Sequence, residues 1–182
     1  MTEPILALYI NKWNLTQDGA SFRTNSSLLQ PCVYKGLRAD WFAPLLNKTN
    51  FSDETLKESA LVAIRLLSDQ TERYVLHGDL HHENILYSDL NGRLAIDPKA
   101  LYGDRAFDFA NILCNPNRQV ALDKDRLVRQ IEVIGQETKI DFDRMLNWVI
   151  AWVGLSAIWM EEDHLDASLP IQLAKIALSL KK

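Results

Sequence analysis

The feature that most constrains the fold of this chain is an uncharged stretch of 16 residues, from Met145 to Met160. It contains Asn147, Gly154 and Ser156 together with three tryptophans, and it is shorter than the roughly 20 apolar residues that a bilayer core requires. We therefore expect a helix buried on all sides inside a globular core rather than a membrane span. The surrounding sequence should supply a helical body to bury it.

Composition favours a single ordinary domain in the cytoplasm. The 182 residues include 20 Lys and Arg against 24 Asp and Glu, a net charge of −4, and 47% of them are apolar. A chain of this length buries roughly 70% of its unfolded surface, so its core needs no disulfide or structural metal. The basic residues are scattered, so we expect neither nucleic acid nor membrane as a partner. Cys32 and Cys114 form no paired motif, and no signal peptide opens the chain, which favours a reducing compartment.

Local patterns predict a change of structure along the first half of the chain. Residues 5–36 contain short apolar runs broken by polar clusters, which is typical of a small sheet or loop region. Helices are expected over 38–47 and 53–68, and Ser52 is the expected N-cap of the second helix.

The middle of the chain is expected to form strands. Short apolar runs at 74–76, 85–87 and 94–96 predict three of them, and Asn91-Gly92 between the last two favours a hairpin. Beyond Pro116 the pattern becomes helical again. The expected features there are an amphipathic face at Leu127, Ile131 and Ile134, an N-cap at Asp141, and a last helix over 171–180.

Polar and ionisable residues concentrate between two expected strands, from His77 to Asn84, where three of the four histidines lie. The open end of the hairpin should return Asp97 close to Asn84, and both beside Asp79. Carboxylate and amide oxygens suit Mg²⁺, which usually shares its remaining positions with water and substrate phosphates. This arrangement favours phosphoryl transfer.

The spacing of these residues matches a kinase template, in which an Asp is followed by an Asn five positions later and by a metal-binding Asp after a hairpin. Here 84 − 79 = 5, and Asp97 follows the hairpin. Asp79 would accept or orient the proton of an attacking hydroxyl, while Asn84 and Asp97 would hold the metal. For each residue taken alone, the capping of a turn remains the alternative.

Three runs of this sequence resemble one family. They are HGDLHHENIL from His77, AIDPK from Ala95 and GDRAFDFANILCNP from Gly103, and they are similar to the aminoglycoside/hydroxyurea phosphotransferases, which include streptomycin 6-kinases. The similarity continues through the tryptophan-rich helix and covers residues 13–33. It implies an α+β, protein-kinase-like fold, ATP and Mg²⁺ as cofactors, and phosphorylation of an alcohol group of a small molecule such as streptomycin or hydroxyurea, an antibiotic-resistance activity.

The resemblance also assigns roles to residues. It makes Asp79 the catalytic base, Asn84 and Asp97 the magnesium ligands, and His77, Asp104 and Asp108 supporting residues. For Asp104 and Asp108 we expect bracing of the catalytic loop and capping of the following helix. Ala100 stands where relatives usually have Gly, a change that matters only where the backbone needs a positive φ.

One part of the family pattern is not found. The strand with the phosphate-binding Lys, the helix with its Glu partner and the adenine hinge are not identifiable, and Lys35 is a weak substitute because no Glu-bearing helix follows it. We expect residues 1–36 to be a remnant of the nucleotide lobe and 37–182 a C-terminal lobe with the catalytic loop, metal site and substrate-binding helices. This predicts weak nucleotide binding, low or absent kinase activity, and self-association through the surface left exposed.

Two other readings of the sequence remain open. His77, His81 and His82, with Asp79 and Asp97, offer ligands for Zn²⁺ or Mn²⁺ and a metal-dependent hydrolase, although no familiar zinc pattern is present. Alternatively, the chain is a truncated, non-catalytic paralogue that binds a ligand or a protein partner. The acceptor itself cannot be named from the sequence, because specificity depends on the shape of a pocket.

Overall fold

The computed structural model describes residues 16–17, 22–23, 28–29, 32–33, 39–70, 72–90, 92–99 and 101–181. In the first part of the chain, β1 (Thr16–Gln17) pairs with β4 (Cys32–Val33), and β2 (Phe22–Arg23) pairs with β3 (Leu28–Leu29), both antiparallel. The expected β content is found there in these two short pairs. Lys35 lies outside the described residues.

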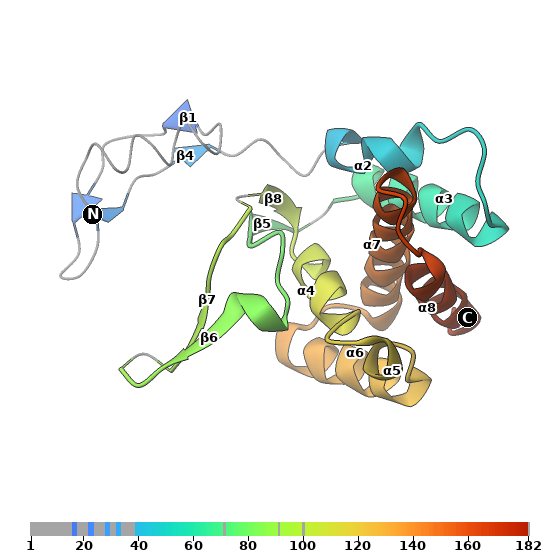
Figure 1. Ribbon diagram of the computed structural model, residues 1–182. Coiled ribbons are helices and arrows are strands. Elements are labelled where there is room, and N and C mark those ends of the chain that lie inside the picture. Colours follow the sequence, from blue (N-terminus) through green and yellow to red (C-terminus); the bar gives the residue numbers. More distant parts are fainter. Residues whose placement is uncertain are drawn as a thin grey trace.

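The long helix α7 (Phe142–Glu162) is the centre of the helical body, as the uncharged stretch predicted. It packs against α3 (Glu54–Ser68), α4 (Ala106–Leu113) and α8 (Ser168–Ser179) (Figure 1). Twelve of its residues are buried, and Trp148 is fully inaccessible to solvent. Asp141 caps its N-terminus as expected, because the Asp141 carboxylate accepts a hydrogen bond from the Arg144 amide at 3.0 Å. Within the described ranges, no helix is long and apolar enough to cross a membrane.

The contact between α3 and α7 depends on a glycine. A Cβ atom at Gly154 would lie 2.3 Å from the Cβ of Ser59, which is closer than two carbon atoms can approach. Ser59 is fully buried, and its hydroxyl donates to the Thr55 carbonyl at 3.0 Å. Gly154 therefore allows the two helices to pack at a distance that no other residue type permits.

The remaining helices are α2 (Ala39–Leu46), α5 (Arg118–Ala121) and α6 (Lys124–Thr138). The expected positions of α2 and α3 and the expected amphipathic face on α6 are confirmed, and the expected last helix is α8, which begins three residues earlier than predicted. The predicted cap of α3 is wrong by one residue. Asp53 is the N-cap, and its carboxylate accepts from the Thr55 amide at 2.8 Å. The Ser52 hydroxyl instead donates to Glu161. Asp and Ser are both good N-caps, so local sequence alone does not choose between adjacent ones.

Two pairs of antiparallel strands complete the fold. The expected hairpin is formed by β6 (Ile85–Ser88) and β7 (Gly92–Ala95), and Gly92, with φ of 70°, already pairs with Ser88. Asn91 is outside the described residues. The other pair joins β5 (Arg73–Leu76) to β8 (Leu101–Asp104), a strand that the sequence patterns did not predict.

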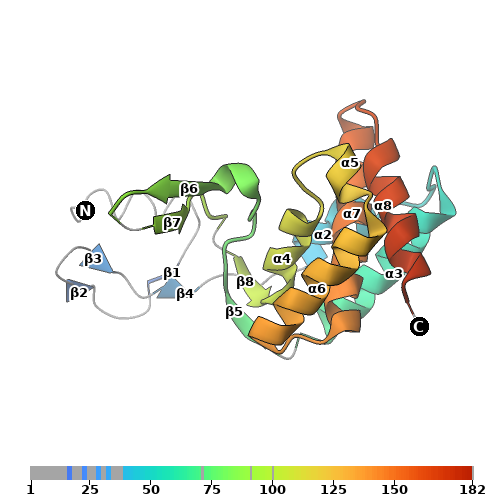
Figure 2. The ribbon, with the colours of Figure 1, turned by 90° about the horizontal axis from the view of Figure 1, so that it is seen from below.

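The β6–β7 hairpin extends away from the helical body (Figures 1 and 2). Several large apolar side chains on the strands are exposed, namely Tyr74, Val75, Leu86, Tyr87 and Leu94. Beneath the strands, the ring of Phe107 on α4 makes edge contacts with Trp148 and Trp152 at 5.5 Å between centroids. This aromatic packing fixes α4, which also carries polar residues of the candidate site.

Candidate active site

The loop that follows β5 is attached to α4 by one carboxylate. The amides of His77 and Gly78 donate to the two oxygens of Asp108, each at 2.7 Å. Gly78 has φ of 80°, and a Cβ there would lie 2.9 Å from the Leu101 side chain. Only glycine suits this backbone, so the loop enters the site in one conformation.

Asp108 is largely removed from solvent. Burial raises its pKa above the usual value for an aspartate, and the hydrogen bonds from Gly78 and His77 act in the opposite direction. Its contacts are those of a residue that braces the loop.

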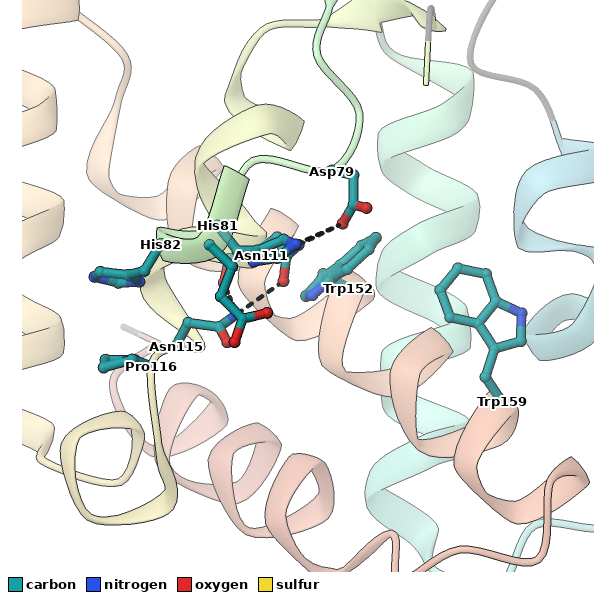
Figure 3. A pocket seen from close by; sticks show the side chains of 9 residues that line it. Asp79, His81, His82, Asn111, Asn115, Pro116, Trp152 and Trp159 are labelled. Atoms are coloured by element: carbon teal, nitrogen blue, oxygen red, sulfur yellow. Dashed lines mark hydrogen bonds and ion pairs between the residues drawn. The ribbon is translucent and has the colours of Figure 1, made fainter. Parts of the chain in front are cut away.

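Asp79 extends from this loop towards the end of α4. The side-chain amide of Asn111 donates to one Asp79 carboxylate oxygen at 3.0 Å, and Asn115 donates to the Asn111 side-chain oxygen at 3.1 Å (Figure 3). The ring of His81 lies 3.8 Å from the same Asp79 oxygen. The chain of amides sets the orientation of the Asp79 carboxylate and leaves its second oxygen for another partner.

Asn84 and Asp97 are brought to Asp79 by the hairpin, as the spacing predicted. The short 3-10 helix η1 (His82–Asn84) ends at Asn84, whose side-chain amide donates to the Asp79 carbonyl at 2.9 Å. The Ile96 amide donates to the Asn84 carbonyl at 2.9 Å, which holds the following residue, Asp97, at the open end of the hairpin. The Asp97 side chain is 66% exposed.

Lys99 links the two carboxylates. Its ammonium nitrogen lies 3.3 Å from an oxygen of Asp97 and 3.4 Å from the second oxygen of Asp79. The hydrogen bond to Asp97, with the charges of both carboxylates, raises the pKa of Lys99 against the opposing effect of burial. Asp79 and Asp97 therefore face a common position that is occupied by a positive charge.

His77 has a structural role that excludes it from a metal centre. Its Nε2 lies 2.8 Å from the Ile96 carbonyl, and its Nδ1 accepts from the Asp79 amide at 3.3 Å. Both ring nitrogens are thus engaged by backbone groups. Within the residues described by the structure, no group of three or more His, Cys, Asp or Glu side chains is arranged to hold a metal ion. The three-histidine centre considered from the sequence is therefore not formed.

Asp104, the last residue of β8, contacts the helical body and lies outside the candidate site. It is 2% exposed, and its carboxylate accepts from the Ala106 amide at 2.9 Å and from the Arg144 side chain at 2.7 Å. It accepts a hydrogen bond from the first backbone amide of α4, whose N-cap is Arg105, and links the start of this helix to α7.

A cavity of about 360 Å³ opens beside Asp79 (Figure 3). Its lining residues are Asp79, His81, His82, Glu83, Asn111, Asn115, Pro116, Trp152 and Trp159. Two of these carry carboxylates and two carry indole rings, and no Lys or Arg is among them. Such a lining suits a hydroxyl-rich cation, because carboxylates attract positive charge and indole faces stack against apolar and cationic groups.

Asn84 and Asp97 fit a magnesium ion in their chemistry. Both offer hard oxygen donors, and the ammonium of Lys99 beside Asp97 marks a position where positive charge is stabilised. Two protein ligands leave room for water and for phosphate oxygens, which is how Mg²⁺ is usually held in phosphoryl-transfer sites.

Sequence reasoning missed the residues that orient Asp79 and those that flank it. Asn111 lies three positions after Asp108 on α4, so both face the loop, and this i, i+3 spacing was the available signal. Asn115 follows one turn later on the same side. Lys99 and Trp152 lie within the family motifs, but their roles are not predictable from the sequence, since nothing local indicates the direction of their side chains.

Comparison with known proteins identifies the family to which a chain with this loop, hairpin and helix belongs. The model of the aminoglycoside/hydroxyurea antibiotic resistance kinases matches residues 37–164. The chain belongs to this family, as the sequence motifs indicated, and membership implies the protein-kinase-like fold.

Curated relatives agree with this assignment. The chain is 42% identical over 129 residues to the streptomycin 3''-kinase of Klebsiella pneumoniae, an alignment that covers 68% of this chain and 48% of that kinase. It is 33% identical over 130 residues to the streptomycin 6-kinase of Streptomyces griseus, covering 70% of this chain and 42% of the relative. The hydroxyurea phosphotransferase of Kitasatospora aureofaciens is 31% identical over 124 residues, 67% of this chain and 34% of the relative. The chain thus spans half or less of the length of these relatives, and no solved structure matches it.

Proposed function

We propose that this chain carries the catalytic and acceptor-binding part of an ATP-dependent phosphotransferase that acts on a hydroxyl group of an aminoglycoside such as streptomycin. The observation that carries the proposal is the position of Asp79, whose carboxylate is oriented by Asn111 at the wall of an acidic, tryptophan-lined cavity. A base in that position meets the hydroxyl of a bound acceptor directly.

Each proposed role follows from a contact. Asp79 orients the acceptor hydroxyl and takes its proton, and Asn111 keeps the carboxylate in the required rotamer. Asn84 and Asp97 hold Mg²⁺, which when bound neutralises charge on the transferring phosphoryl group. Asp108 accepts hydrogen bonds from two loop amides and so holds the loop against α4.

The acceptor is a polycation with several hydroxyl groups. Asp79 and Glu83 contribute two carboxylates to the cavity lining, and no Lys or Arg is among the lining residues to attract an anionic acceptor. Trp152 and Trp159 provide aromatic surface on α7, with ring centroids 5.9 Å apart. Streptomycin, which the names of two relatives carry, has this chemistry, whereas hydroxyurea is small and uncharged and would leave the indoles uncovered.

The nucleotide side of the site is proposed to be incomplete. Residues 1–36 are proposed as the remnant of a nucleotide lobe and 37–182 as the C-terminal lobe, because the matched family region begins at residue 37. An adenine slot between two lobes requires both of them, so Mg·ATP should bind weakly to this chain and turnover should be low.

Acceptor binding is tested without nucleotide. Titration of the chain with streptomycin should quench tryptophan fluorescence, and the change should fall in Trp152→Phe, which retains an aromatic ring against Phe107. Sucrose is the neutral control and should leave the fluorescence unchanged. Equal responses to streptomycin and sucrose would contradict the assignment of the cavity.

Phosphotransfer is tested by mass spectrometry of streptomycin incubated with Mg·ATP and the chain. Asp79→Asn should lower product formation by about 10²–10⁴-fold, the range assigned to a general base, while streptomycin still binds. Asp89→Asn, an exposed change on the hairpin, is the matched control and should be neutral. Full activity of Asp79→Asn would remove Asp79 from its role.

A second candidate function is binding of the acceptor without turnover. The exposed apolar side chains of β5 and β6, including Val75 at 59% and Tyr87 at 74%, favour it, because they lack the cover that a complete nucleotide lobe would give. Streptomycin binding with no phosphorylated product under any condition would select this second function.

A further inference from the structure

The position of Lys99 has a consequence for how the site takes up a metal ion. The Lys99 ammonium lies within 3.4 Å of Asp79 and within 3.3 Å of Asp97, the two carboxylates of the proposed reaction. Its side chain is 41% exposed, so its flexible stem is free to turn towards a neighbouring anion. Neither carboxylate is the exclusive partner of this cation.

We propose that Lys99 is an internal counter-ion that competes with a divalent metal ion for Asp79 and Asp97, and that it takes phosphate oxygens as new partners when the metal enters together with a nucleotide. The inference rests on the proposed function, since it uses Asp97 as a metal ligand. It goes further by making the metal affinity of the site higher when phosphate is also bound.

The physical argument is one of charge balance. With Lys99 in place, a divalent ion that enters alone must share two carboxylates with an ammonium group a few ångströms away, which opposes binding. A phosphate chain supplies negative charge to both cations and removes that repulsion. Metal and phosphate therefore bind with positive coupling, and the coupling is reciprocal.

The test compares two ligands in one pair of proteins. Manganese(II) replaces Mg²⁺, and calorimetry measures the affinity of Mn²⁺ alone and of the preformed Mn·ATP complex for the wild-type chain and for Lys99→Met. Lys99→Met should bind Mn²⁺ alone about threefold to tenfold more tightly, since one nearby positive charge is lost. It should bind Mn·ATP about threefold to tenfold more weakly, since the phosphate loses a partner.

Opposite shifts distinguish this role from a structural one, because damage to the fold would weaken both affinities. Lys99→Arg retains the charge and should bind both Mn²⁺ alone and Mn·ATP with affinities close to those of the wild-type chain. Lys175→Met removes an exposed lysine that pairs with Asp53 at 2.6 Å outside the site, and it should change neither affinity. Circular dichroism verifies that every variant is folded.

Each outcome decides the inference. Equal Mn²⁺ affinity in wild type and Lys99→Met overturns the competition, and an unchanged or tighter affinity of Lys99→Met for Mn·ATP overturns the phosphate contact. Absence of Mn²⁺ binding in both proteins overturns the inference together with the metal role of Asp97. Opposite shifts without any phosphorylated streptomycin support the inference while the proposed function fails.

Discussion

Removal of the Asp108 carboxylate should destabilise the folded chain. In Asp108→Ala the amides of His77 and Gly78 both lose their acceptor, and each currently donates over 2.7 Å. A buried amide without a partner costs about 1–3 kcal/mol. Gly78 is buried while His77 is half-buried, so water partly restores the bond of His77 and the expected loss is about 2–4 kcal/mol. Asp108→Asn should lose about half as much, because its oxygen accepts one amide while its NH₂ group faces the other.

The pH dependence of this effect has a defined sign. Burial raises the pKa of Asp108 in the folded chain, so the native state binds the proton more tightly than the unfolded state does. The contribution of Asp108 is then complete below its ordinary pKa of 3.8 and declines as the pH rises through the raised value. The stability difference between wild type and Asp108→Asn should therefore shrink with rising pH above about 4 and then level off.

Urea unfolding followed by tryptophan fluorescence measures the loss of stability and its dependence on pH. Amide hydrogen exchange at Gly78 shows whether the loop is released. Asp89→Ala, which removes an exposed carboxylate on the hairpin, should change stability by less than about 0.5 kcal/mol. An Asp108→Ala variant as stable as that control, with Gly78 still protected, would refute the role of the two hydrogen bonds.

Three further changes test other parts of the structure. Gly154→Ala should destabilise the lobe by about 1–3 kcal/mol through its clash with Ser59, and thermal unfolding should show partial recovery in the double variant with Ser59→Gly. Cys114, whose pKa burial raises to about 12, should resist thiol reagents in the native chain and react once urea unfolds it. Hydrogen bonds from Lys175 and Thr55 lower the pKa of Asp53 to about 2. The stability that Asp53 contributes should therefore be present above about pH 4 and be lost between pH 4 and 2, which comparison with Asp53→Asn by urea unfolding at each pH would reveal.

The sequence predicted those parts of the fold that depend on neighbouring residues. The uncharged stretch around Trp148 predicted a buried helix, because burial on every face excludes charge along the whole length. The hairpin was found because its turn and both strands lie within a dozen residues. The strand β8 was missed, since Leu101–Asp104 has no alternating pattern and its partner β5 lies 25 or more residues earlier.

The residues of the candidate site also fall into two groups, those that nearby sequence brings together and those that only tertiary packing brings together. The spacing of Asp79, Asn84 and Asp97 was readable because one loop and one hairpin bring them together. Asn111 was not assigned, since its hydrogen bond to Asp79 depends on how α4 packs against the loop. Lys99 escaped notice for a similar reason: the direction of a long side chain is set by charges that only the folded chain gathers.

Because α4 carries both a core residue and site residues, the spacing of residues along this helix is as important as its composition. Phe107 points into the aromatic core, while Asp108 and Asn111 hold the loop and the carboxylate of Asp79. One inserted or deleted residue between Phe107 and Asn111 would rotate the part of the helix after the change by about 100° relative to the part before it. Substitutions of similar shape would preserve the contacts of Phe107 and of Asn111, whereas a single-codon insertion or deletion would disconnect the core from the site even if every original side chain were kept.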